Sequence, residues 1–396
     1  MKKIIIVANW MQGEALSGGD HIFIELTKRW QHKIKTTLYI SKEGEGICNR
    51  EGLNKTPKFV WASDSVRPFG YFLDSIYRTT VSARKAFLID TNSIDVVFSS
   101  SDFWPDFIPA LILKTREPKI HWIGAFYLFA PKPWKKNSPY RGKSYLTGML
   151  YWISQQVSYY CINRFSDVIF VTSQPDVKRF VTPKRSKEKV ITIKGGVDTS
   201  PANNYLNSGN ITPLENRKYD ACFVGRFHYQ KGVLELINIW KKVCESRPNA
   251  LLSMIGIGPL ENEVKTLINQ HQLTKNINLL GFMVGNEKFN IFKQSKIVVH
   301  PATYDSGGMA AAEAMAWGLP GVSFDLEALK SYYPRGMVKT KCFDHHKFAD
   351  NILALLSDHH YHQSVSQEAL ELVRMHWDWD LRADEIYDKA IVCKES

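Results

Sequence analysis

The feature that most constrains the fold of this chain is a regular alternation of short apolar runs and longer amphipathic segments. In the first half, each apolar run has the length of a buried strand, and residues 20–30 carry apolar side chains at helical spacing. The strands predicted in this half cover residues 4–8, 37–40, 96–99, 120–123 and 168–172. Because strands that alternate with helices form a parallel sheet with helices on both faces, we predict an α/β fold.

The alternation pauses between residues 194 and 217 and then starts again. This stretch is rich in Gly, Asn, Pro and Ser, and we interpret it as a linker. Beyond it, we predict strands at 220–224, 251–255, 277–280 and 297–300, and helices at 232–245, 261–272 and 286–294. Two repeats of one architecture in a chain of 396 residues predict two domains, over 1–196 and 197–376.

The most informative motif follows the predicted strand at 297–300, where residues 305–320 read DSGGMAAAEAMAWGLP. Gly307 and Gly308 let the backbone approach a ligand closely, and the small residues after them favour a helix. Free amides and the positive end of the helix dipole gather at the start of such a helix, which suits an anion such as a diphosphate. We expect the nearby Asp305 and Glu313 to accept hydrogen bonds from hydroxyl groups of a sugar and a ribose.

This motif resembles the E-x7-E pattern of retaining glycosyltransferases with the GT-B fold, in particular glycosyltransferase family 4. The matching residues are Glu313, Ala314, Met315, Gly318 and Pro320, at the family's spacing. Asp305 replaces the first Glu by a carboxylate that is one methylene shorter. The resemblance implies two Rossmann-like domains whose parallel sheets face each other across a cleft. It also implies that 197–376 bind the nucleotide sugar, and that 377–396 pack back on the N-terminal, acceptor-binding domain.

A second motif, VGRFHYQKG at residues 224–232, resembles the G-R-x4-K-G element of the same family. Negative charge grows on a nucleoside diphosphate as its bond to the sugar breaks, and an Arg fork with a Lys charge stabilises it most when it is fully developed. We therefore expect Arg226 and Lys231 to act as electrostatic catalysts. The resemblance assigns Asp305 to the sugar hydroxyls and Glu313 to the ribose.

The resemblance also supplies further donor-binding residues, most of them in glycine-rich turns. The expected donor-binding set is Gly18, Gly19, Gly225, Gly258, Met283, Ser306, Gly307, Gly308, Met309 and Glu313. Members of the family usually carry a His at the end of a middle strand of the first domain, where it touches the donor sugar. The candidate here is His121, which lies three residues before the aligned position near Gly124. We count His121 with the catalytic residues, and the alternative is a histidine of the core.

The net charge of +12 is concentrated in one half of the chain. Residues 1–200 hold 30 Lys and Arg against 17 Asp and Glu, a net charge of +13. Such a basic half predicts an acidic partner, and without a nucleic-acid-binding signature we expect anionic lipid or a lipid diphosphate rather than nucleic acid. Residues 126–152 interleave aromatic and basic side chains, as at a membrane interface, although a basic loop followed by a core helix fits equally.

Residues near the ends of predicted strands, and in the basic stretch, are candidates for contact with the acceptor. They are Asp102, Trp104, Lys135, Lys136 and Arg141. The six cysteines are scattered and form no C-x-x-C pair, which fits a reducing cytosol. The uncharged stretch 144–163 is too polar for a good transmembrane candidate, so we expect a cytoplasmic protein, peripheral on the inner face of the membrane.

Together these patterns predict a retaining glycosyltransferase that moves a hexose-type sugar from a UDP- or GDP-sugar to a hydroxyl of a glycan or lipid-linked glycan. We expect no metal and no cofactor besides the substrate nucleotide sugar, because two bases and a helix N-terminus stabilise the diphosphate. The main alternative is a catalytically weak nucleotide-sugar-binding subunit of a membrane glycosylation complex. A sugar-nucleotide epimerase and a nucleic-acid binder are weaker alternatives.

Overall fold

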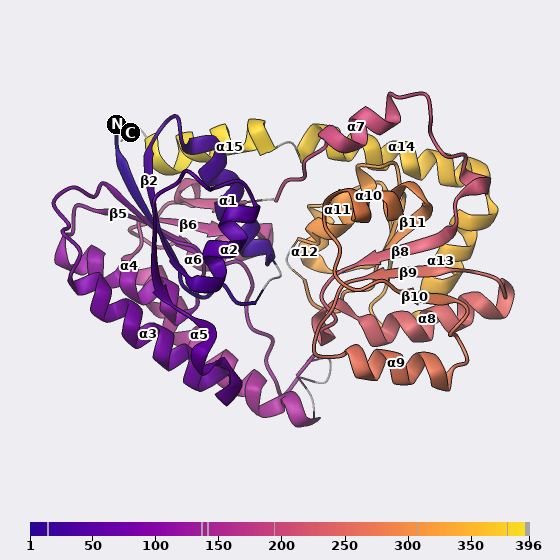
Figure 1. The fold of residues 1–396 in the computed structure, drawn as a ribbon, viewed down its shortest axis with the longest axis horizontal. Coiled ribbons are helices and arrows are strands. Elements are labelled where there is room, and N and C mark those ends of the chain that lie inside the picture. The colour runs from indigo at the N-terminus through magenta and orange to yellow at the C-terminus, as the bar shows by residue number, and fades with distance from the viewer. Residues whose placement is uncertain are drawn as a thin grey trace. The chain divides into compact units, whose positions relative to one another are not determined.

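The computed structural model describes residues 1–13, 16–135, 138–140, 142–193, 195–305, 307–377 and 379–392. The chain divides into two compact units, which we call unit 1 and unit 2 (Figure 1). Unit 1 consists of Met1–Gly195 together with Trp379–Ser396, and unit 2 of Gly196–Asp378. Within the described residues, no helix is both long enough and apolar enough to cross a membrane.

Unit 1 is built on a seven-stranded sheet in the order β3-β2-β1-β4-β5-β6-β7. Its strands are β1 Lys3–Ala8, β2 Lys35–Ser41, β3 Lys58–Ala62, β4 Val96–Ser99, β5 His121–Ala125, β6 Val168–Val171 and β7 Val190–Thr192. All neighbouring strands run parallel, and the five strands predicted from the sequence are confirmed. The order of the strands changes direction between β1 and β4, which makes the carboxyl ends of these two strands the place where a ligand is expected.

Both faces of this sheet are covered, which explains the continuous apolar runs in its strands. Along β1, Ile4 and Ile6 belong to the core on one face, and Ile5 and Val7 to the core on the other. The first core is closed by α1 Gly18–Trp30, α2 Lys42–Arg50 and α15 Trp379–Tyr387. The second is closed by α3 Tyr71–Phe87, α4 Trp104–Arg116, α5 Tyr145–Phe165 and α6 Val177–Phe180.

The C-terminal helix α15 lies against α1 (Figure 1). The Trp30 indole N–H donates to the main-chain oxygen of Ala383 at 2.9 Å, and Arg29 pairs with Asp380 at 2.5 Å. The two chain segments that connect the units are joined at the edge of unit 2, where the Val197 N–H donates to the oxygen of Trp377 at 3.0 Å. Unit 2 is therefore an insertion into unit 1.

Unit 2 repeats the architecture with six parallel strands in the order β10-β9-β8-β11-β12-β13. The strands are β8 Tyr219–Val224, β9 Leu252–Ile255, β10 Ile277–Leu279, β11 Ser295–His300, β12 Gly321–Phe324 and β13 Met337–Thr340. The helices are α7 Ser200–Leu206, α8 Val233–Ser246, α9 Glu261–Gln270, α10 Gly285–Lys293, α11 Met309–Met315, α12 Glu327–Lys330, α13 His345–Ser357 and α14 His359–His376. Core clusters lie on both faces of this sheet as well.

The stretch 194–217 is not the plain linker that its composition predicted. Residues 200–206 form α7, which has Pro201 in its first turn, where a missing N–H costs nothing. Ala202 is fully buried and Tyr205 packs against Trp317 with ring centroids 5.6 Å apart. These apolar contacts make α7 part of the core of unit 2, and they outweigh the turn-forming residues around the helix.

Candidate active site

A charged cluster of unit 2 joins the two motifs found in the sequence. The Lys231 Nζ lies 2.6 Å from the Asp305 Oδ2, and the His300 Nε2 lies 3.1 Å from the same oxygen. Lys231 ends a short 3₁₀ turn after β8, His300 is the last residue of β11, and Asp305 lies in the turn before α11. β8 and β11 are neighbours in the sheet, so the cluster sits at the carboxyl ends of its two central strands.

Main-chain hydrogen bonds hold the two loops together around this cluster. The oxygen of Gln230 accepts from the N–H groups of Thr303 at 3.0 Å and Tyr304 at 3.3 Å. Gly232 has φ +63°, and a Cβ on it would lie 1.9 Å from the Pro301 oxygen. Glycine is required here by contact between two backbones, and that contact places Lys231 beside Asp305.

The glycine turn after Asp305 is organised by the Asp305 carboxylate itself. Its Oδ1 accepts from the N–H groups of Gly307 at 3.3 Å and Gly308 at 3.4 Å. Gly308 has φ +60°, and a Cβ there would lie 2.9 Å from the His300 Nε2. The Tyr333 hydroxyl donates to the Gly308 oxygen at 2.6 Å. The amides that we assigned to a diphosphate thus bind an anion in the structure, and that anion is the side chain of Asp305.

The electrostatics of the cluster keep Asp305 ionised. Burial raises the pKa of Asp305, but the charge of Lys231 and the contacts with His300 outweigh burial and hold this pKa well below the usual 3.8. Burial, with the charges of Arg226 and Lys231, lowers the pKa of His228 to about 4. The contribution of Arg226 and Lys231 to this shift places both basic side chains near His228, in the loop after β8.

The other glycines of the predicted donor site serve close contact between neighbouring loops. A Cβ on Gly256, which has φ +142°, would lie 1.9 Å from the oxygen of Gly225. A Cβ on Gly258 would lie 2.5 Å from the oxygen of Phe227. The Gly256 N–H also donates to the oxygen of Gly281 at 2.8 Å. The loop after β9 is thus in contact with the loop after β8, through Gly225, and with the loop after β10, through Gly281. These loops carry Arg226 and the half-buried Met283.

Glu313 lies inside α11 and pairs with a lysine that the sequence motifs did not single out. Its Oε1 lies 2.6 Å from the Nζ of Lys288, a residue of α10, and 28% of its side chain is exposed. Met309 is the first residue of the same helix. The carboxylate is thus partly open to a ligand and is held in place by a lysine from the neighbouring helix.

Gly18 and Gly19 are the first two residues of α1 in unit 1, so the helix begins two residues before the predicted start at residue 20. Ser17 and Asp20 form a capping box at the start of this helix. A Cβ on Gly19 would lie 3.0 Å from the ring of Tyr127, so this glycine allows the helix to approach the end of β5 closely.

The position of His121 contradicts its assignment to the donor site. His121 is the first residue of β5, at the amino end of the sheet, whereas ligands bind at the carboxyl ends of such strands. Its Nε2 lies 2.9 Å from the oxygen of Ala390, and burial lowers its pKa. His121 therefore links β5 to the C-terminal segment. The shift of three residues from the aligned position near Gly124 places it a strand's length from the expected site.

The predicted acceptor residues near the end of β4 are held by α5. The Asp102 Oδ2 accepts from the Gln155 Nε2 at 2.8 Å, and the Trp104 indole N–H donates to the oxygen of Ser154 at 3.0 Å. Burial raises the pKa of Asp102 to about 6. Lys135 is exposed. Three predicted site residues, Lys136, Arg141 and Ser306, lie outside the described residues.

The sequence motifs missed three residues of the site in unit 2, namely His300, Lys288 and Tyr333. His300 could have been found from the sequence, because it ends a predicted strand only five residues before Asp305. Lys288 and Tyr333 come from separate elements, and the sequence contains no local pattern that connects them to the motifs.

Residues 208–371 match the model of the family described as glycosyl transferases group 1. An uncharacterized glycosyltransferase of Methanocaldococcus jannaschii is 30% identical over 203 residues, 48% of this chain and 47% of that protein. The gpi3 subunit of phosphatidylinositol N-acetylglucosaminyltransferase of Schizosaccharomyces pombe is 22% identical over 176 residues, 44% of this chain and 38% of that protein. The chain thus spans about half the length, or less, of these curated relatives.

Solved structures match over nearly the whole chain. Anabaena HepE in complex with UDP and glucose has a TM-score of 0.69 at 15% identity, covering 98% of this chain and 99% of that one. A mutant of S. aureus TarM in complex with fondaparinux, alpha-GlcNAc-glycerol and UDP has a TM-score of 0.74 at 11% identity and covers both chains fully. The chain therefore has the GT-B fold with two Rossmann-like domains, and its match over residues 208–371 supports a glycosyltransferase of group 1.

Proposed function

We propose that this protein is a retaining glycosyltransferase that transfers a hexose-type sugar from a UDP- or GDP-sugar to a hydroxyl of a glycan or lipid-linked glycan, without a metal ion. The observation that carries this proposal is the Lys231–Asp305–His300 cluster at the carboxyl ends of β8 and β11. It combines a cation for a leaving diphosphate with a carboxylate for sugar hydroxyls. The HepE structure with UDP and glucose, and the TarM structure with UDP and saccharides, support a donor and an acceptor of these classes.

In the proposed mechanism, the donor diphosphate replaces the Asp305 carboxylate as the partner of Lys231. Arg226 and Lys231 then stabilise the negative charge that develops as the bond between the anomeric carbon and the phosphate oxygen breaks. Asp305, released from Lys231, accepts hydrogen bonds from the sugar hydroxyls, and Glu313 accepts from the ribose. The acceptor hydroxyl forms the new bond on the face that the phosphate leaves, and a phosphate oxygen takes its proton. This sequence retains the anomeric configuration.

The second candidate function is a nucleotide-sugar-binding subunit with weak or no transfer activity. It is favoured by Asp305, which is shorter than the glutamate of the family pattern, and by the similarity to a subunit of a larger glycosyltransferase. Such a subunit would bind a nucleotide sugar without consuming it, so product formation separates the two functions.

A thermal-shift screen with UDP- and GDP-sugars, followed by mass analysis of the products, tests the proposal. We expect stabilisation by one class of nucleotide sugar, release of the free nucleoside diphosphate, and loss of that release in Lys231→Ala. The matched control is Lys275→Ala, because Lys275 is an exposed lysine of the same unit. Stabilisation without release would favour the binding subunit, and neither effect with any donor would refute the proposed function.

We also propose that α5 lies on an anionic membrane in the cytoplasm. Leu146, Ile153, Val157 and Tyr160 are spaced as one face of this helix and are 68%, 50%, 46% and 67% exposed. The +13 charge of residues 1–200 is complementary to anionic lipid. Flotation with phosphatidylcholine vesicles, with and without phosphatidylglycerol, tests this surface. Binding should require the anionic lipid and be lost in the Leu146→Ser, Ile153→Ser, Val157→Ser triple variant. Ile211→Ser, a change at an exposed apolar residue of unit 2, is the control.

A further inference from the structure

A buried arginine in unit 1 organises the loop that follows β1, and the two sequence motifs do not involve it. Arg78 lies in α3 and its side chain is completely buried. Its guanidinium donates to the main-chain oxygens of Asn9 at 2.8 Å and Met11 at 3.3 Å. Because a guanidinium presents five N–H donors in a rigid fork, one side chain can fix two points of a loop and still bind carboxylates.

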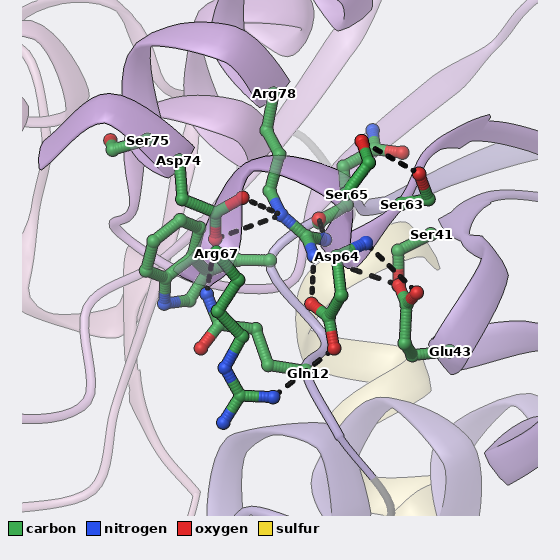
Figure 2. A network of polar contacts seen from close by, with 12 residues as sticks. Gln12, Ser41, Glu43, Ser63, Asp64, Ser65, Arg67, Asp74, Ser75 and Arg78 are labelled. Carbon is green, nitrogen blue, oxygen red and sulfur yellow. Dashed lines mark hydrogen bonds and ion pairs between the residues drawn. The ribbon is translucent and has the colours of Figure 1, made fainter. Parts of the chain in front are cut away.

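Three carboxylates from three different elements surround this guanidinium (Figure 2). The Arg78 Nε lies 3.0 Å from an oxygen of Asp74 in the same helix, and the Nη2 lies 3.6 Å from Glu43 of α2. The Nη2 also pairs with Asp64, which begins the 3₁₀ helix Asp64–Phe69. Arg78 therefore ties α2, α3 and this 3₁₀ helix to the end of the central strand β1.

The same carboxylates hold the loop directly. The Gln12 Nε2 donates to the Asp74 Oδ2 at 2.9 Å, and the Gly13 N–H donates to the Asp64 Oδ2 at 3.2 Å. On the other side of the loop, the Trp10 N–H donates to the Asp106 Oδ1 at 3.0 Å. Every residue from 9 to 13 thus takes part in a hydrogen bond to Arg78, to one of its carboxylates or to Asp106.

Burying ion pairs in a protein carries a large desolvation cost. The buried charges around Arg78 therefore suggest that the loop needs one fixed shape. The loop follows β1, at the point where the strand order of unit 1 changes direction, and it leads toward Gly18 and Gly19. Ligands of open α/β sheets bind at such a point. The side chain of Trp10, which stacks on Phe103 of the loop after β4 at 5.0 Å, is half-buried and its indole N–H has no hydrogen-bond partner among the described residues.

We propose that Arg78 is a positioning residue for acceptor binding, which holds the loop 9–13 in the shape that contacts the hydroxyl-bearing acceptor. This inference rests on the proposed glycosyltransferase function and deepens it, because it assigns the acceptor to the switch point of unit 1. Arg78 touches no substrate in this scheme and acts through the main chain of Asn9 and Met11.

The test compares Arg78→Lys and Arg78→Met with Arg67→Met. Arg67 is the matched control, because it pairs with the same Asp64 at 3.1 Å but is 45% exposed. Hydrogen exchange reports on the loop without any activity. The amides of Trp10 and Gly13, which donate to Asp106 and Asp64, should exchange at least about tenfold faster in Arg78→Lys, which keeps the charge but loses the fork, while those of β1 stay protected. Unchanged exchange in these amides would overturn the proposal.

Kinetics then separate positioning from general stability. With the saccharide that the wild-type enzyme extends, Arg78→Lys should raise the acceptor KM about tenfold, while hydrolysis of the donor alone stays within about twofold. Equal losses in both reactions, or the same increase in Arg67→Met, would overturn the positioning role. If Arg78→Met does not fold, Arg78→Lys still decides. If the wild-type protein neither hydrolyses nor transfers any nucleotide sugar, the proposed function is refuted. The hydrogen-exchange experiment still tests whether Arg78 fixes the loop, because it does not depend on activity.

Discussion

The pair between Lys231 and Asp305 allows a prediction in which stability and catalysis respond differently. The Asp305 side chain is 10% exposed and that of Lys231 is 31% exposed. Removing one partner of a fully buried pair costs about 3–5 kcal/mol, and an exposed pair is worth about 0–1 kcal/mol. Because Lys231 is partly solvated and His300 and two amides still contact Asp305, we expect Lys231→Met to lower the free energy of unfolding by about 1–3 kcal/mol.

The double variant Lys231→Met, Asp305→Asn should recover part of this loss, because it leaves no unpaired carboxylate. We expect a coupling free energy of about 1–2 kcal/mol in the double-mutant cycle, measured by urea unfolding near pH 7.5. The catalytic effect should not recover. Nucleoside diphosphate release should fall about 100-fold to 1,000-fold in Lys231→Met and in the double variant alike, since both lack the cation.

The pH dependence of this difference has a defined sign. The pKa of Asp305 is lowered in the folded protein, so its contribution to stability is present above pH 3.8 and is lost as the pH falls below it. The difference between wild type and Lys231→Met should therefore shrink below pH 3.8. Lys275→Met is the control for loss of one lysine. Additive costs in the cycle, or release near the wild-type rate in Lys231→Met, would refute the reasoning.

Three further predictions concern other positions. Glu313→Gln should weaken donor binding about tenfold through loss of the charged acceptor that Lys288 holds, and an unchanged dissociation constant in calorimetry would contradict this. Gly256→Ala should lower the free energy of unfolding by about 2 kcal/mol or more, because its Cβ would lie 1.9 Å from the Gly225 oxygen; a melting temperature like that of the wild type would show that the loops adapt. Burial raises the pKa of Asp106 to about 7, so this carboxyl ionises at a lower pH in the unfolded state than in the folded state. The free energy of unfolding should therefore fall as the pH rises from about 4 to about 7. In urea unfolding, Asp106→Asn should make that decline smaller. Parallel pH profiles of the wild type and the variant would contradict this prediction.

Much of the sheet architecture could be predicted from the sequence because its central strands are buried on both faces. The prediction for β4 has the same bounds as the strand in the structure, and those for β1, β8 and β9 differ by one residue. The strands β3, β7, β12 and β13 were missed, and all of these except β12 lie at a sheet edge. In β3, the sequence has a short apolar run over residues 59–62, but Phe59 and Val60 are exposed at the edge of the sheet.

Only the residues of the candidate site that belong to a sequence motif could be predicted. Lys231 and Asp305 lie 74 positions apart, and only the resemblance to a known family connected them before the structure did. The ion pair of Glu313 with Lys288 joins two helices, and such a contact depends on tertiary packing that a local pattern does not encode. The network of Arg78 is a stronger example, because its partners come from four separate segments of unit 1.

The return of the chain to unit 1 has a consequence for biosynthesis. On the ribosome, the first 195 residues emerge long before Trp379, Ala383 and Ile386, which complete the same core. At typical elongation rates of about 5–20 residues per second, the nascent unit 1 waits roughly 10–40 s with Trp30 uncovered. Unit 2 ends at residue 378, so its last residues emerge only at the end of that interval, just before the helix that completes the core of unit 1. A premature stop codon after residue 378 would therefore damage the domain that is translated first.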